Sequence, residues 1–501
     1  MRKILIFLIS VIMISNILSI FSVSAASTTY KIADLKGKYK TQGRTVLQNG
    51  TLFMEWSASG IEFNAKCSGS VIVEMETLRT WTGDTNGAYF TVIVDGAVQS
   101  ENKRIPTENH HDSWKNNSTN YPFHITNKGK ASFVIAKDLK DGVHNFKIFN
   151  QSEAVNASYG IHSITLNGEF VDPPQESNLF IEFIGDSITA GYGNIAHGGG
   201  GEVALYKDAT RGWPYLTANK LGADWSVVAT SGIAAGNGYG WSDEKSVSMQ
   251  TVYPKLRYYS DKQTDYNFER QPDVVVLGLG TNDMWTYKNA GKTENDVKNE
   301  FKAMLNLVME KNPNSKIIWI YGMMLNSADS LIKNTVEELG GIGKGLYTLQ
   351  LPLCSTGHPG EEFQPDYAAK LSLFISKIVD VSVQKPTSAP SNDKELSSSV
   401  VSDRFNRTSS KKSSEPKDNS SEVSSNKTVS ESVSSKIEKT SSKAINNSSV
   451  DTSTSSENAD VSSENEKTEP QNKPPYLLVG IVAAAMVVVA AIISVLIKIK
   501  K

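Results

Sequence analysis

The sequence predicts an α/β domain with a mainly parallel β-sheet, preceded by an all-β region and followed by an unstructured stalk and a C-terminal membrane helix. Three observations support this fold class. Strand patterns without helical stretches fill the first third of the chain, apolar runs then alternate with helical patterns, and a tract of Ser, Lys, Glu, Asn and Thr follows. The chain has 501 residues, which is too many for one hydrophobic core.

The first residues have the composition of an export signal. Arg2 and Lys3 precede an apolar stretch that runs to about residue 21, and small residues follow at positions 22–26. We therefore expect a signal peptide over residues 1–26, with a retained N-terminal anchor as the alternative.

A β-sandwich is predicted over residues 30–172. Residues 70–76 alternate between apolar and polar side chains, so the apolar ones share one face of a strand. The Asp-Gly dipeptides at 95–96 and 141–142 are typical of tight turns between strands. The paired prolines at 173–174 end this region, because they cannot continue a central strand.

A parallel α/β domain is predicted over residues 178–384. Apolar runs typical of buried strands appear at residues 179–184, 225–229, 274–279 and 317–321. Helical patterns between these runs call for a sheet with helices on both faces. One helix begins after Thr293, with Asp296 at capping-box spacing, and the last begins near Pro365. Their expected buried stripes are Val297, Phe301, Met304, Leu305 and Val308 in the first, and Ala368, Leu371, Phe374, Ile375 and Ile378 in the second.

The last part of the chain predicts a stalk and an anchor. Residues 385–475 are almost without aromatic side chains, so they cannot offset chain entropy by burial and are expected to be disordered. Residues 476–497 carry no charge and can cross a hydrocarbon core of about 30 Å as a transmembrane helix. Residues 498–501, three of which are lysine, are expected to form a cytoplasmic tail, so we expect the rest of the mature chain at the cell surface, outside the plasma membrane.

Composition excludes several partners. The net charge is −2 and no basic stripe is present, so nucleic acid is not an expected partner. Cys67 and Cys354 fall in different predicted domains, so we expect two free, buried thiols. The cluster at residues 110–112 (His-His-Asp) has no matching second set of ligands, so we expect no metal and no cofactor.

Ser187 is the candidate nucleophile. It follows an apolar run that ends at Gly185 and Asp186, as when a buried strand delivers a side chain to the open edge of a parallel sheet. A serine hydroxyl needs a base to take its proton and hydrogen-bond donors to stabilise the oxyanion. Asn282 follows another strand, and His358 precedes the last helix, so both can reach the same edge.

His358 is the candidate base, which takes the proton of Ser187 and later protonates the leaving alcohol. The other histidine of this region, His197, lies in a Gly-rich stretch that fixes its backbone less well. The backbone N–H groups of Ser187 and Gly232 and the side-chain amide of Asn282 are the candidate oxyanion donors.

These stretches resemble the SGNH hydrolases, whose four blocks correspond here to residues 185–187, Gly232, residues 280–283 and the His358 region. With the preceding β region, the chain resembles carbohydrate esterase family 2 over roughly residues 38–383. The resemblance implies a flavodoxin-like sheet and a jelly-roll N-terminal domain. It also implies acetyl xylan esterase-like activity, the deacetylation of plant polysaccharides such as xylan or glucomannan.

One departure from the SGNH pattern concerns the acid of the triad. Most SGNH hydrolases carry Asp three residues before the histidine, where this chain has Ser355. The resemblance allows a Ser–His dyad, in which a backbone carbonyl near residues 355–357 accepts from His358 Nδ1–H. A remote acid is the alternative, and Asp366 is the nearest downstream candidate, although its position is typical of a helix start.

Aromatic residues follow the same strand ends. Trp285, Trp241 and Tyr192 are the expected substrate contacts, because aromatic rings offer flat apolar faces to a sugar. Core packing is the alternative for each, and it is favoured for Trp213, which opens a predicted helix.

The sequence thus predicts an extracellular, membrane-anchored carbohydrate O-acetyl esterase that acts on acetylated polysaccharide or oligosaccharide through an acyl-enzyme on Ser187. The alternatives are an esterase of cell-wall glycan or lipid esters and a non-catalytic glycan-binding surface protein. The presence of Ser187, Gly232, Asn282 and His358 together argues against the last alternative.

Overall fold

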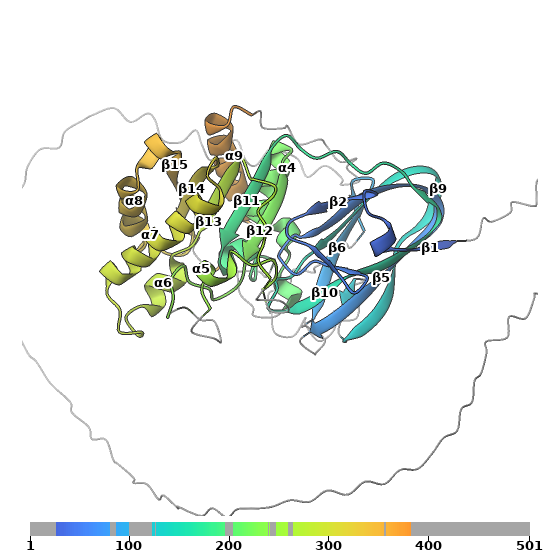
Figure 1. The fold of residues 1–501 in the computed structure, drawn as a ribbon, viewed down its shortest axis with the longest axis horizontal. Coiled ribbons are helices and arrows are strands. Elements are labelled where there is room, and N and C mark those ends of the chain that lie inside the picture. Colours follow the sequence, from blue (N-terminus) through green and yellow to red (C-terminus); the bar gives the residue numbers. More distant parts are fainter. Residues whose placement is uncertain are drawn as a thin grey trace, which may run out of the picture. The chain divides into compact units, whose positions relative to one another are not determined.

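The computed structural model describes residues 27–80, 87–99, 123–125, 127–195, 204–238, 240, 247–258, 264–354 and 357–381. They fall within one compact unit, Met1–Val400 (Figure 1). Among them, no helix combines the length and the apolar composition needed to span a bilayer. The predicted signal peptide, the linker from residue 385 onward and the predicted transmembrane segment lie outside the described residues.

The N-terminal region is antiparallel β-structure, whose strands join into one hydrogen-bonded sheet in the order β3-β4-β10-β5-β9-β6-β7. β1 pairs with β10, β2 with β5 and β8 with β6. The predicted division into two packed sheets, a jelly-roll sandwich, stays a prediction. The elements are β1 (Thr28–Lys31), the 3-10 helix η1 (Ile32–Asp34), β2 (Tyr39–Gln42), β3 (Val46–Gln48), β4 (Thr51–Phe53), β5 (Gly60–Thr80), β6 (Ala88–Val94), β7 (Ala97–Val98), β8 (His124–Ile125), β9 (Gly129–Asn150) and β10 (Ala157–Phe170).

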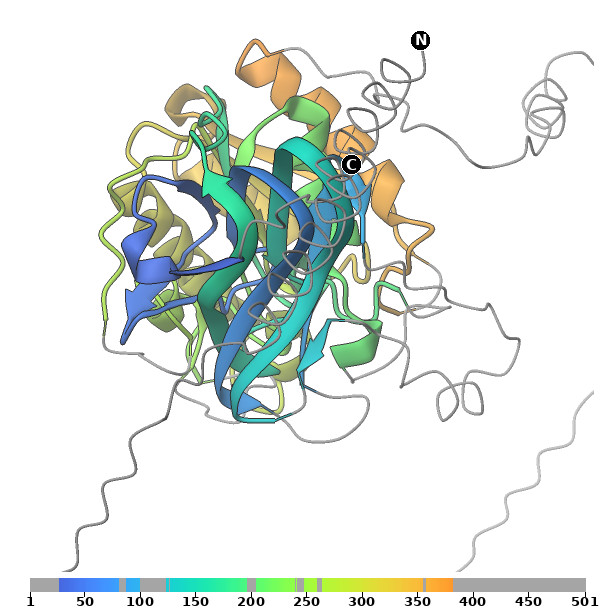
Figure 2. The same cartoon turned by 90° about the vertical axis from the view of Figure 1, so that its right-hand side faces the viewer.

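The long strands β5 and β9 dominate this region and run side by side in Figure 2 (blue and cyan). The apolar side chains at residues 71, 73 and 75 of β5 are fully buried, as their alternation predicts. The turn predicted at Asp141–Gly142 is wrong, because β9 continues through it with Gly142 opposite Cys67. Register shifts along this pairing bend the strand instead of reversing it. The turn at residues 95–96 is observed, with positive φ at both residues.

The α/β region contains a five-stranded parallel sheet in the order β12-β11-β13-β14-β15, so the predicted parallel sheet is confirmed. The strands are β11 (Phe180–Gly185), β12 (Asp224–Ala229), β13 (Val274–Gly278), β14 (Lys316–Gly322) and β15 (Leu346–Leu351). The helices are α3 (Ser187–Ala190), η3 (Ala204–Tyr206), η4 (Ala209–Arg211), α4 (Trp213–Leu221), α5 (Met249–Val252), α6 (Thr281–Thr286), α7 (Glu294–Lys311), α8 (Asp329–Glu338), η5 (Gly341–Lys344) and α9 (Gln364–Ile378).

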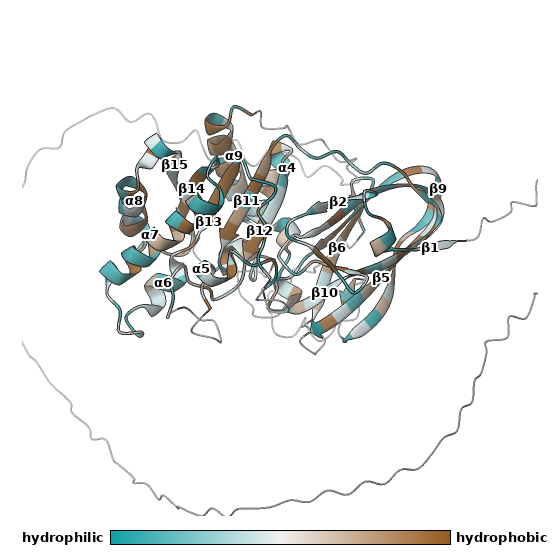
Figure 3. Cartoon of the chain, viewed as in Figure 1, coloured by the Kyte–Doolittle hydropathy of each residue, from teal (hydrophilic) through white to brown (hydrophobic). Residues whose placement is uncertain are grey.

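Helices cover both faces of this sheet, as predicted (Figure 1). Buried residues of α5, α7 and α8 share one apolar core with one side of the strands, and those of α4 and α9 share a second core with the other side. The strands are strongly hydrophobic in Figure 3, because each is buried on both faces. The predicted capping box between Thr293 and Asp296 begins α7, and the predicted stripe of α7 is fully buried.

Three buried ion pairs join the N-terminal region to the α/β region. Arg44 Nη2 lies 3.1 Å from Glu182 Oε1 of β11. Glu55 Oε1 lies 2.6 Å from Arg257 Nη2. Glu153 pairs with Lys207. Because a buried charge without a partner is strongly unfavourable, each pair requires both regions to be in place.

Candidate active site

Ser187 stands at the sharp connection between β11 and α3. Asp186 is the N-cap of α3, and its Oδ1 accepts from Ile188 N at 3.0 Å. Gly185 is required at this turn, because a Cβ at this position would lie 2.0 Å from Thr189 Oγ1. The turn therefore presents Ser187 at the carboxyl edge of the sheet, where parallel α/β folds bind ligands.

His358 is in hydrogen-bond contact with Ser187. Its Nε2 lies 2.8 Å from Ser187 Oγ, although the two residues are 171 positions apart in the chain. The His358 ring packs against the Tyr192 ring at a centroid distance of 4.4 Å. Gln364 Nε2 donates to Pro359 O at 2.8 Å, which ties the His358 loop to the start of α9. Nothing in the spacing of Gln364 marks it in the sequence as a residue of the site.

The His358 imidazole is held in its neutral form. Burial lowers the pKa of His358 to about 4, while the charge of Glu153 acts to raise it and that of Lys207 to lower it. A neutral imidazole beside a hydroxyl can accept its proton, which is the function of a general base. The arrangement can therefore activate Ser187 as a nucleophile at neutral pH.

No carboxylate is hydrogen-bonded to His358 in the described part of the chain. Asp366, the alternative acid, is exposed in the first turn of α9. Ser355 and Thr356 lie outside the described residues, so the backbone carbonyl expected to orient the imidazole stays a prediction.

The structure brings the two further candidate oxyanion donors together. β11 is flanked by β12 and β13, with Gly185 in register with Ala229 and Gly278, so the segments that follow share one edge. Asn282 Nδ2 donates to Ile233 O at 2.9 Å, directly after Gly232. The second amide hydrogen of Asn282 is left for another acceptor, and Gly232 has the positive φ (78°) that favours glycine.

Two buried carboxyl groups lie beside these residues. Asp283 accepts from Ala235 N at 3.0 Å and from Gly236 N at 3.1 Å. Burial raises the pKa of Asp283 to about 6 and that of Asp186 to about 7. Both hold backbone N–H groups of the turns that carry the candidate site, and Asp186 Oδ2 is buried without a hydrogen-bond partner.

The predicted aromatic contacts divide into three groups. Trp285 is 48% exposed on α6, one turn after Asn282, and so is open to a ligand. Tyr192 packs on His358. Trp241 lies outside the described residues. Trp213, for which the sequence favours core packing, is a fully buried residue of α4.

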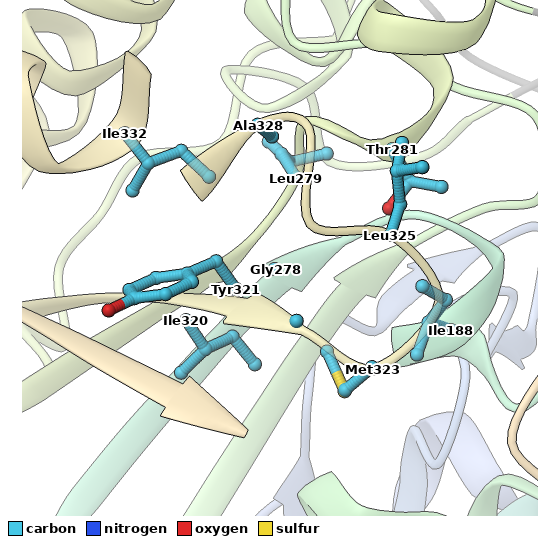
Figure 4. A pocket seen from close by; sticks show the side chains of 11 residues that line it. Ile188, Gly278, Leu279, Thr281, Ile320, Tyr321, Met323, Leu325, Ala328 and Ile332 are labelled. Atoms are coloured by element: carbon cyan, nitrogen blue, oxygen red, sulfur yellow. The ribbon is translucent and has the colours of Figure 1, made fainter. Parts of the chain in front are cut away.

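A small apolar pocket lies at the carboxyl ends of β13 and β14 (Figure 4). Its cavity volume is about 10 Å³, which is about the space that one water molecule needs. Ile188 and Thr281, which line it, are the chain neighbours of Ser187 and Asn282. Its other walls include Leu279, Ile320, Met323 and Leu325. The pocket offers apolar surface beside the site and no charged group.

Among the described residues, no group of three or more His, Cys, Asp or Glu side chains is placed so that it could hold a metal ion. The cluster at residues 110–112 lies outside them. Cys67 and Cys354 are both free thiols, and Cys67 is buried whereas Cys354 is only partly buried.

The chain is similar to known hydrolases. Residues 183–372 match the model of the GDSL-like lipase/acylhydrolase family. A cellulase/esterase, CelE, of Acetivibrio thermocellus is 27% identical over 259 residues, which cover 49% of this chain and 31% of the relative. An acetylxylan esterase/glucomannan deacetylase of Cellvibrio japonicus is 31% identical over 178 residues, 34% of this chain and 47% of the relative. The chain thus spans about a third and about half of these two relatives.

Solved structures share the fold. A family two carbohydrate esterase from Clostridium thermocellum, in complex with cellohexaose, aligns with a TM-score of 0.57 at 22% identity, covering 68% of this chain and 99% of that one. An acetyl xylan esterase, Est2A, from the rumen bacterium Butyrivibrio proteoclasticus aligns with a TM-score of 0.59 at 19% identity, covering 71% and 99%. Both alignments exceed the α/β region, so the likeness extends into the N-terminal β region.

Proposed function

We propose that this chain, whose residues 183–372 match the model of the GDSL-like lipase/acylhydrolase family, is a carbohydrate O-acetyl esterase that deacetylates plant polysaccharides such as xylan or glucomannan. The observation that carries the proposal is the 2.8 Å contact between Ser187 Oγ and His358 Nε2 at the carboxyl edge of the sheet. The names of the relatives, an acetylxylan esterase/glucomannan deacetylase and a cellulase/esterase, support the substrate class.

The proposed reaction proceeds through an acyl-enzyme. Ser187 Oγ attacks the acetyl carbonyl carbon while His358 Nε2 takes the hydroxyl proton. The oxyanion accepts hydrogen bonds from the N–H groups of Ser187 and Gly232 and from the Asn282 amide. Collapse of the tetrahedral intermediate breaks the ester bond, and His358 protonates the departing sugar hydroxyl. Water then attacks the acetyl-Ser187 ester with His358 again as base, which releases acetate and restores Ser187.

We further propose that the sugar chain lies along Trp285, whose half-exposed ring offers an apolar face near Asn282. The esterase is proposed to act at the cell surface, exported by residues 1–26 and anchored in the plasma membrane by residues 476–497. The hydrophobicity of these two sequence segments supports this location.

The proposal is tested by acetate release from acetylated xylan, acetylated glucomannan and an aryl acetate, with Ser187→Ala as the control variant. We expect all three activities in the native chain and a loss of about 10³-fold or more in the variant, as for removal of a catalytic nucleophile. The absence of Ser187-dependent release from all three substrates would refute the esterase. Release from the aryl acetate alone, together with hydrolysis of longer acyl esters, would point instead to lipid esters.

A further inference from the structure

We propose that Glu153, which the N-terminal region supplies, is a positioning residue for the oxyanion donors. It lies between β9 and β10, outside the part of the chain that matches the hydrolase family. This inference rests on the proposed esterase function, because it assigns Glu153 to the Gly232 donor of that mechanism.

Glu153 binds one residue at two points. Its Oε2 accepts from Ser231 N at 2.5 Å, and its Oε1 accepts from Ser231 Oγ at 2.6 Å. Ser231 directly precedes Gly232, so the peptide that carries the Gly232 N–H begins at the residue that Glu153 holds. Two hydrogen bonds to a carboxylate fix both the backbone and the side chain of Ser231, and with them the direction of this N–H.

The rest of the donor segment is held from α6. Asn282 binds the carbonyl of Ile233, and Asp283 binds the N–H groups of Ala235 and Gly236. Residues 231–236 are therefore fixed at one end by the α/β region and at the other end by the N-terminal region. Oxyanion stabilisation depends on donors that are oriented before the reaction, so loosening either end weakens catalysis.

Lys207 gives this arrangement its charge balance. The Glu153 side chain is fully buried, and Lys207 Nζ pairs with its Oε1. Burial alone acts to raise the pKa of Glu153, but Lys207 and the Ser231 donors outweigh it, so the pKa lies below its usual range. An uncompensated carboxylate here would oppose the negative charge that develops on the substrate. The pair thus supplies a strong acceptor for Ser231 without a net charge beside the oxyanion.

Lys207 also connects the pair to the base. Its Nζ lies 4.9 Å from the centroid of the Tyr192 ring, and that ring packs on His358. The buried pair therefore contacts two parts of the site. Glu153 binds the segment that carries the Gly232 donor, and Lys207 lies over the Tyr192 ring that packs on His358.

The test uses the double variant Glu153→Gln/Lys207→Met, which removes both charges together and so leaves no unpaired buried ion. Glutamine can keep both contacts by accepting from Ser231 N and donating to Ser231 Oγ, but these neutral hydrogen bonds are only about half as strong as those of the carboxylate. With an aryl acetate we expect kcat to fall about 10- to 100-fold while KM changes less than about threefold, as for lost transition-state stabilisation. The affinity for an arylboronic acid, which forms a tetrahedral adduct with a serine, should weaken by the same factor.

The matched control is Glu55→Gln/Arg257→Met. It removes a second buried ion pair between the same two regions, without contact to residues 231–236. Both double variants are expected to lower the thermal midpoint by similar amounts, but the control keeps kcat within about twofold. Equal losses of kcat in the two variants would overturn the proposal, because they would show a general effect of the interface.

Hydrogen exchange supplies a readout that does not depend on activity. The amides of residues 231–236 should exchange about tenfold faster or more in Glu153→Gln/Lys207→Met, while those of β14 stay protected. Unchanged exchange in this segment would overturn the proposal even if kcat fell. If the native chain showed no Ser187-dependent hydrolysis, the esterase proposal would fail, and the exchange result would still decide whether Glu153 fixes this segment.

Discussion

The burial of His358 governs how its imidazole can act. Exclusion from water disfavours the imidazolium, so the pKa of His358 falls to about 4. The ring is then neutral, and able to take the Ser187 proton, throughout the range from about pH 5 upward.

We expect the acid limb of the kcat/KM profile near pH 4 to 5, below the usual range for histidine, because activity is lost only when His358 becomes protonated. The measurement is kcat/KM for an aryl acetate between pH 3.5 and 8, with circular dichroism at each pH to confirm that the chain is folded. A limb centred near pH 6.5 in the folded chain would contradict this assignment.

The proposed catalytic residues and the residues that position them differ in how far the sequence could predict them. Ser187 is predictable because it follows a recognisable strand, and His358 because it precedes a recognisable helix. The structure confirms that their side chains are in contact. Glu153 and Gln364 could not be predicted in this way. Glu153 contacts Ser231 from 78 positions away, and no local pattern records a contact that exists only after two regions have packed.

At the scale of the element, the turn from β11 to α3 sets the position of Ser187. Gly185 there faces Thr189 Oγ1 and Gly278 O, which leave no space for a methyl group. The turn can therefore be tested without touching the hydroxyl that it presents.

Gly185→Ala is expected to destabilise the fold by about 1–3 kcal/mol, because the added methyl group must displace packed atoms. Gly343→Ala in η5 is the matched control, since a methyl group there meets nothing within 4 Å. Urea unfolding of both variants measures the difference. Equal stability of Gly185→Ala and Gly343→Ala would show that the turn is less crowded than the structure indicates.

Regular elements were predicted best where one local signal determined them. The capping box of Thr293 and the apolar stripe that follows it correctly predict α7, which begins at Glu294. The Asp-Gly signal at residues 141–142 misled, because the same dipeptide is accommodated in a bent strand when a long partner such as β5 satisfies its backbone. Whether an Asp-Gly dipeptide forms a turn depends on which strand pairs with it, and local sequence does not determine that partner.

At the scale of the whole molecule, buried ion pairs make the two described regions interdependent. Arg44 illustrates this, since its guanidinium pairs with Glu182 and donates to Lys255 O at 2.8 Å. It also lies over the Tyr266 ring at 4.1 Å. Its partners all belong to the α/β region, although Arg44 itself belongs to the N-terminal one.

We therefore expect residues 27–381 to unfold in one calorimetric transition. Arg44→Met is expected to lower the free energy of unfolding by about 3–5 kcal/mol, because it leaves Glu182 buried without its ion partner. Lys298→Met, which removes an exposed pair with Glu338 on the surface, should change the stability far less, because water and salt screen an exposed ion pair. Two separate transitions would refute the interdependence of the regions.

The contact between Glu153 and Ser231 also limits how the two regions can be exchanged during evolution. The segment that matches the hydrolase family contains Ser187, Gly232, Asn282 and His358, yet one anchor of its donor loop is encoded upstream of it. A recombination event that replaced only the upstream region would keep all the proposed catalytic residues but remove the contact from Glu153 to Ser231. Such a chimera would keep its activity only if the incoming region brought a carboxylate to the same place, so the two regions are expected to have evolved as one unit.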